Sequence, residues 1–61
     1  MVKIKKRRFD LIGKVIYREK SDCSYWYIAG YNSAQGVYEA VNVYDEHDTF
    51  TPSDFIGDYI V

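Results

Sequence analysis

Two side chains in this sequence have the chemistry of a catalytic pair. Cys23 is the one cysteine and His47 the one histidine, and an imidazole beside a thiol can activate it as a nucleophile. Both residues lie in segments rich in turn-forming residues, and the sequence offers no third group to orient the imidazole. We therefore expect a protein that is not an enzyme, with Cys23 partly buried and His47 facing solvent.

A second cluster, Asp45-Glu46-His47-Asp48, carries oxygen and imidazole ligands that a divalent cation could use. It lacks the glycine and the ligand spacing of an EF-hand loop, and there is no second histidine for a zinc site. The four glycines are scattered along the chain, so no phosphate-binding glycine loop is present. The sequence predicts no metal and no cofactor, and 45–48 is expected to be a polar turn.

Charge is divided unequally along the 61 residues. Residues 1–20 hold all eight Lys and Arg against two acidic residues, a net charge of +6, whereas residues 21–61 hold seven Asp and Glu and no Lys or Arg, a net charge of −7. Such asymmetry suggests a polyanion-binding arm or an acidic interaction face. If the basic arm pairs with the body, the remaining surface is acidic; if it is free, the surface is bipolar.

Two binding functions follow from this pattern. In the first, aromatic residues and carboxylates without nearby cations form a face for a basic protein partner, and that partner could itself bind nucleic acid. The residues expected on this face are Tyr25, Tyr27, Tyr38, Glu39, Tyr44, Asp45, Glu46 and Asp48. In the second, a basic N-terminal arm binds nucleic-acid phosphates. Its residues are Lys3, Lys5, Lys6, Arg7 and Arg8. The alternative for the tyrosines is that they only cover a small core as cross-strand pairs.

The composition favours strands, since Tyr, Val and Ile are abundant and there is only one Leu. Apolar and polar residues alternate in several short segments separated by turn-forming residues. The expected strands are 2–5, 11–18, 25–31, 37–44 and 58–61. A hairpin loop is expected at 32–36, and a short helical turn at 52–56 with Thr51 as its N-cap and Pro52 in its first position. The expected core residues are Trp26, Ile28, Val41, Val43, Phe50, Phe55 and Ile60.

Short antiparallel strands with one late helical turn predict a small all-β domain over residues 1–61, in which 1–8 is a basic arm or a first strand. The segment Thr51-Pro52-Ser53-Asp54-Phe55-Ile56 resembles the turn before the last strand of SH3 domains, and Trp26-Tyr27-Ile28-Ala29 is similar to the paired aromatics that open their central strand. The characteristic opening motif of SH3 domains is absent. The resemblance therefore implies a topology, a strongly bent SH3-like barrel of four to five antiparallel strands.

The setting of the protein is expected to be the cytoplasm. A single cysteine cannot close an intramolecular disulfide, and no apolar run is long enough for a signal peptide or a membrane span. The small size and the acidic, tyrosine-rich segments suggest a phage-type inhibitor or accessory factor. A homodimer through an exposed strand edge at 2–5 is a further expectation.

Overall fold

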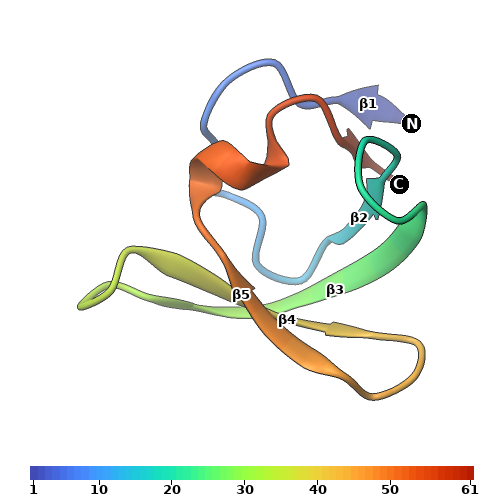
Figure 1. Cartoon of the computed structure of the whole chain (residues 1–61). Coiled ribbons are helices and arrows are strands. Elements are labelled where there is room, and N and C mark those ends of the chain that lie inside the picture. The colour runs from blue at the N-terminus through green and yellow to red at the C-terminus, as the bar shows by residue number, and fades with distance from the viewer.

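The computed structural model describes residues 1–61 as one antiparallel sheet with the strand order β1-β6-β2-β3-β4-β5 and a single short 3₁₀ helix, η1 (Figure 1). The strands are β1 (Val2–Lys3), β2 (Val15–Arg18), β3 (Ser24–Asn32), β4 (Val37–Asn42), β5 (His47–Phe50) and β6 (Tyr59–Ile60). The predicted all-β class is confirmed. The structure has six strands rather than four or five, and the sheet is open because β1 and β5 each have only one neighbour.

The longest strand of the sheet, β3, is interrupted by a bulge. The pairing of β3 with β4 shifts register between Ile28 and Gly30, which places a bulge inside a nine-residue strand. A bulge bends its strand and increases the local twist. As a result β3 pairs with β2 near its start and with β4 along most of its length (Figure 1).

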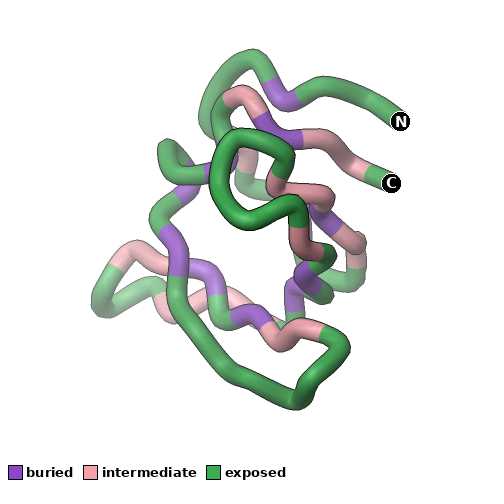
Figure 2. Tube along the Cα trace, turned by 45° about the vertical axis from the view of Figure 1, so that its right-hand side comes forward, coloured by how far each residue is buried: buried purple, intermediate pink, exposed green.

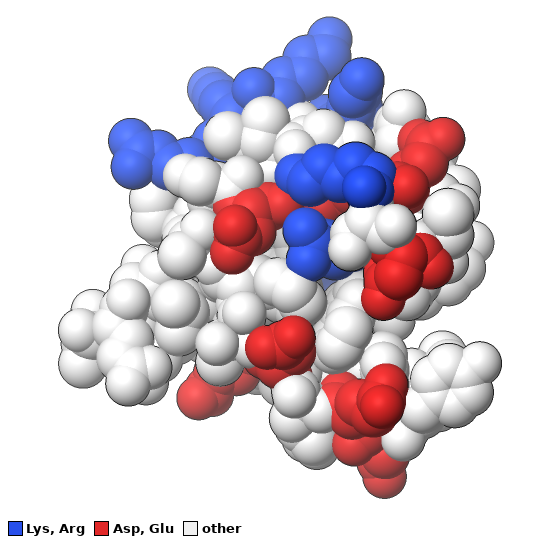
Figure 3. Space-filling view, in the orientation of Figure 1, with Lys and Arg blue, Asp and Glu red and all other residues white.

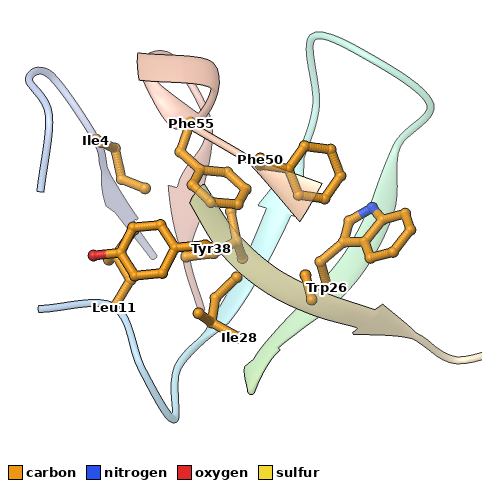
Figure 4. Packing of buried hydrophobic residues seen from close by; sticks show 9 residues of the cluster. Ile4, Leu11, Trp26, Ile28, Tyr38, Phe50 and Phe55 are labelled. Carbon is orange, nitrogen blue, oxygen red and sulfur yellow. The ribbon is translucent and has the colours of Figure 1, made fainter. Parts of the chain in front are cut away.

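The core lies on the inner side of this bent sheet. Nine buried apolar residues pack there: Ile4, Leu11, Ile16, Trp26, Ile28, Tyr38, Ala40, Phe50 and Phe55. The ring centroids of Trp26 and Phe50 are 5.2 Å apart, and those of Phe50 and Phe55 are also 5.2 Å apart (Figure 4). Buried positions therefore come from β2, β3, β4, β5, η1 and the connection after β1 (Figure 2).

The predicted core is wrong at Val41 and Val43. The alternation along β4 is as expected, but Tyr38 and Ala40 face the core, and Val43 is 79% exposed. The opposite choice of face follows from the strand pairing, in which Ile28 lies opposite Ala40 and Trp26 opposite Asn42. Because register partners share a face, the buried Trp26 and Ile28 turn the even-numbered residues of β4 inward.

The predicted helical turn is confirmed as η1 (Pro52–Phe55). The Thr51 hydroxyl accepts a hydrogen bond from the Asp54 amide, and the Asp54 carboxylate accepts one from the Thr51 amide at 2.8 Å. This reciprocal capping box stabilises the start of the turn. It positions Phe55, which has no exposed surface, over the core.

The strands at the two ends of the sheet differ from prediction. Residues 47–48 do not belong to a polar turn; they begin β5, which pairs with β4 so that Glu39 lies opposite Thr49. The strand expected from residue 11 begins only at Val15, because Lys14 closes a turn on Leu11 and Gly13 has a φ of 84°. No helix of the structure has the length and apolar character that crossing a membrane requires.

Candidate protein-binding face

The outer surface of β2, β3 and β4 carries a contiguous group of apolar and aromatic side chains. We call it the tyrosine face, and it comprises Val15, Tyr17, Tyr25, Tyr27, Val41 and Val43. Period-2 alternation places these residues outward because Ile16, Trp26, Ile28 and Ala40 face the core. Of this group, only Tyr25 and Tyr27 were predicted to lie on a binding face.

Cross-strand pairing arranges the tyrosine face in two adjacent rows. Val15 lies opposite Tyr27, and Tyr27 lies opposite Val41. In the next row Tyr17 lies opposite Tyr25, and their ring centroids are 4.9 Å apart. A shallow groove of about 170 Å³, lined by Tyr25, Tyr27 and the valines of the face, runs between the strands.

Much of this face is open to solvent. Tyr25 is 44% exposed and Tyr27 is 47% exposed, in addition to Val43. None of the six residues is Lys or Arg. Exposed apolar patches with a polar rim mark interaction surfaces more often than ordinary protein surface does, and tyrosine combines a large contact area with one polar atom.

The rim of the face at the β4–β5 turn is acidic. Tyr44 is 80% exposed, and Asp45 and Glu46 follow it. The Asn42 side chain organises this turn, since its Oδ1 accepts hydrogen bonds from the backbone amides of Tyr44 at 2.9 Å and Glu46 at 3.0 Å. Neither Asp45 nor Glu46 forms an ion pair with a Lys or Arg. Their negative charge therefore remains at the surface.

Two further predicted acidic residues lie beside this rim. Glu39 on β4 and Asp48 on β5 line an open hollow of about 550 Å³ together with His47 and Thr49. The hollow adjoins the tyrosine face, because His47 lies opposite Val41. The structure thus brings Glu39, Asp48 and the β4–β5 turn to the same end of the sheet, and neither Glu39 nor Asp48 has a cation partner.

Tyr38 is buried, so the prediction that it lies on the protein-binding face is wrong. It has no exposed surface and packs against Phe55 with ring centroids 6.0 Å apart. Its hydroxyl donates a hydrogen bond to the backbone oxygen of Arg8 at 2.8 Å. Burial raises the pKa of the Tyr38 phenol above its usual value. Tyr38 is a core residue that joins β4 to the N-terminal segment.

The structure does not bring Cys23 and His47 into hydrogen-bond contact. Cys23 is exposed, and its thiol lies 3.8 Å from the backbone oxygen of Glu19. The nearby Cys23 side chain raises the pKa of the Tyr17 phenol. His47 is exposed on the edge strand β5. No group of three His, Cys, Asp or Glu side chains is arranged to hold a metal ion.

Three of the eight basic residues form ion pairs, and the other five, which include Lys14, do not. Arg8 forms a two-point ion pair with Asp10, at 2.9 and 2.6 Å, which lowers the pKa of the Asp10 carboxyl. Arg18 and Lys20 approach the buried Asp58. The predicted arm residues Lys3, Lys5, Lys6 and Arg7 form no ion pair. The charges of these four residues are therefore unpaired, and the surface is bipolar, with cations gathered at the β1 end and carboxylates along the middle and the opposite end (Figure 3).

Comparisons of the chain with protein-family models, with curated proteins and with solved structures find no match.

Proposed function

We propose that this domain is a non-enzymatic protein-binding module that uses the tyrosine face and its acidic rim. The observation that carries the proposal is the contiguity of an exposed aromatic surface with carboxylates that have no cation partner. Such a surface buries apolar area on binding and attracts a partner of opposite charge. The partner is then a protein whose contact surface is apolar at its centre and basic at its edge.

The acidic rim supports a specific class of partner. Asp45, Glu46 and Asp48 present carboxylates at one end of the sheet. To a nucleic-acid-binding protein, these carboxylates would take the place of the phosphates that its basic surface contacts. Charge complementarity of this kind accelerates association and selects the orientation of docking. We infer an accessory or inhibitory role toward such a protein in the cytoplasm, consistent with the small size and the free cysteine.

An SH3-like relationship remains part of the proposal. It is supported by the capped 3₁₀ turn directly before the last strand and by the strong bend of β3. The proposed binding face is on the outer surface of the sheet, so the proposal does not depend on proline-peptide recognition.

Differential capture tests the function. The wild-type domain, a face variant (Tyr25→Ser with Tyr27→Ser) and a matched control (Ile12→Ser) would be immobilised and exposed to nuclease-treated lysate of the source cell. Ile12 is 56% exposed and lies outside the face. We expect one or a few proteins to bind the wild type and the control, and their recovery to fall at least about tenfold with the face variant, because aromatic residues at the centre of interfaces dominate binding energy.

A second variant keeps this experiment decisive if the double substitution unfolds the domain. Val43→Glu alters a residue that is 79% exposed and follows β4 directly, so folding should be retained while a charge enters the apolar face. Equal recovery of the same proteins by the wild type and by folded Val43→Glu would contradict the proposal.

A further inference from the structure

A second surface, at the opposite end of the molecule, carries four cations that the protein-binding face does not use. We call it the basic loop, and it comprises Lys3, Lys5, Lys6 and Arg7. All four residues are exposed. None of them forms an ion pair or a side-chain hydrogen bond, in contrast to Arg8, Arg18 and Lys20.

The backbone of the basic loop is fixed at both ends. Ile4 is 1% exposed, its amide donates to the backbone oxygen of Asp58 at 2.8 Å, and its own oxygen accepts from the Gly57 amide at 2.8 Å. At the other end the Tyr38 hydroxyl holds the backbone of Arg8. The cations therefore project from an ordered segment, and less conformational entropy is lost when they bind a ligand.

The fold also prevents the acidic residues from neutralising this surface. Burial of Ile4 turns its neighbours Lys3 and Lys5 outward, because side chains alternate along an extended chain. The carboxylates gather along the middle and the opposite end of the molecule, whereas the cations of the basic loop lie together at the β1 end (Figure 3). The two acidic residues nearest the loop are already paired, Asp10 with Arg8 and the buried Asp58 with Arg18.

An aromatic ring lies directly beside these cations. Lys3 pairs across the sheet with Tyr59, and its ammonium group lies 6.0 Å from the centre of that ring. A row of cations next to an aromatic ring is the combination with which proteins hold single-stranded nucleic acids, the cations contacting phosphates and the ring stacking on a base. Phe9, two residues after Arg7, is 67% exposed and packs edge-on against Tyr31 with ring centroids 6.4 Å apart.

We propose that the basic loop and Tyr59 bind single-stranded nucleic acid without sequence preference. The phosphates contact Lys3, Lys5, Lys6 and Arg7, and a base stacks on Tyr59 when the Lys3 side chain moves to a phosphate. Tyr59 adjoins the tyrosine face, because it lies opposite Tyr17, whereas Lys5, Lys6 and Arg7 lie beyond the strands of that face. The domain could therefore hold a nucleic acid at the basic loop beside a protein on the tyrosine face. The proposal does not depend on the proposed protein partner.

Fluorescence anisotropy with a labelled twenty-nucleotide oligothymidine tests this site. We expect binding whose logarithmic affinity falls with logarithmic salt concentration with a slope of about −3, as about four phosphate contacts on a single strand require. The variant Lys5→Gln/Lys6→Gln/Arg7→Gln should make the salt dependence shallower, with a slope of about −1 in place of about −3, and should weaken binding at least about tenfold. Tyr59→Leu should weaken binding at least about fivefold and leave the slope unchanged.

The control must match the net charge of the triple variant, which changes from −1 to −4. Ser33→Glu/Ala34→Glu/Gln35→Glu makes the same change at the exposed β3–β4 hairpin. We expect the control to keep at least one third of the wild-type affinity. Equal losses in the triple variant and the control, or a slope that the triple variant leaves unchanged, would overturn the site.

Two alternative ligands, a nucleic-acid duplex and an anionic membrane surface, are measured beside the oligothymidine. A duplex of the same length bound as tightly as the single strand would overturn the assignment to single strands. Binding to vesicles that contain phosphatidylserine, without binding to the oligonucleotide, would show a membrane-surface site and contradict the proposal. The triple variant should still capture the protein partner from nuclease-treated lysate, so a failure of this site is distinguishable from a failure of the tyrosine face.

Discussion

The guanidinium of Arg18 on β2 donates through Nε to Oδ2 of Asp58, the residue before β6, at 3.0 Å. Asp58 has no exposed surface, and the Arg18 side chain is 12% exposed. The same guanidinium lies 4.5 Å from the centre of the Phe50 ring, and Lys20 approaches Asp58 at 3.6 Å. At this contact, cations from the basic part of the sequence are paired with a carboxylate from the acidic part. The charges that remain unpaired lie toward opposite ends of the molecule, with cations at the β1 end.

The pairing of Arg18 with Asp58 should be important for stability. Asp58→Asn leaves the poorly solvated Arg18 without its carboxylate. We therefore expect the free energy of unfolding to fall by about 2–4 kcal/mol. This loss is near the lower part of the range for broken buried pairs, because the second cation beside Asp58, Lys20, is partly solvated. Urea unfolding measures this loss. Asp10→Asn is the matched control, since its pair with Arg8 is exposed, and it should change the stability little.

A double-mutant cycle separates this pair from general effects of the substitutions. If Arg18→Gln and Asp58→Asn act through one interaction, their combined effect should be at least about 1 kcal/mol smaller than the sum of the single effects. Additive effects would show that the two side chains stabilise the fold independently.

Tyr38 should be intolerant of truncation because it is a core residue. Tyr38→Ala removes a fully buried ring and should cost about 3–5 kcal/mol, which can unfold a domain of this size. Tyr38→Phe keeps the ring and loses the hydrogen bond to Arg8, so about 1 kcal/mol is expected. Thermal unfolding of both variants gives the comparison, and a mild effect of Tyr38→Ala would contradict the burial of this side chain.

Tyr38 should also make the domain sensitive to alkaline pH. Burial raises the pKa of its phenol above the usual 10.0, so the folded state keeps a proton that the unfolded chain releases. This contribution to stability is fully present below pH 10 and is lost as the pH rises through the pKa of the folded state. Denaturant unfolding across this range should show a steeper loss for the wild type than for Tyr38→Phe. Equal slopes would contradict the assignment to Tyr38.

The capping box before β6 gives a further expectation. Thr51→Ala removes the side-chain oxygen that accepts from the Asp54 amide and should lower the free energy of unfolding by about 1 kcal/mol. Ser53→Ala, in the same exposed turn but without a capping hydrogen bond, is the control. Equal effects of the two substitutions in urea unfolding would show that the cap is not formed in solution.

Local sequence patterns predicted the elements whose determinants lie within a few residues. The capped turn at Pro52 needs only Thr51 and Asp54 nearby, and the hairpin after Asn32 depends on its side chain accepting hydrogen bonds from Ala34 and Gln35 and on Gly36 at a φ of 68°. These features were predictable because their hydrogen bonds are local.

The face of β4 that enters the core could not be predicted from its own residues. Val37, Val41 and Val43 are as apolar as Tyr38 and Ala40, and the choice depends on pairing with β3 across the bulge. The same dependence hid most of the tyrosine face. Tyr25 and Tyr27 were predicted on the face; among its other members, Val15 and Tyr17 carried a signal, since they share one side of a strand whose other side holds Ile16.

The strand β5 was missed for a different reason. Its residues His47 and Asp48 are polar because the strand forms an edge of the open sheet, and edge strands commonly carry charged residues that discourage pairing with other chains. A homodimer through residues 2–5 stays a prediction; in the structure β1 contains only Val2 and Lys3.

The most direct test of the proposed function is a nuclear magnetic resonance titration of the isotope-labelled domain with the captured partner. The account predicts that chemical-shift changes concentrate on Tyr17, Tyr25, Tyr27 and Val41 and extend to the β4–β5 turn, while the basic loop changes little. Changes confined to Lys3–Arg7, with the outer face of β2, β3 and β4 unaffected, would contradict the assignment of protein binding to the tyrosine face.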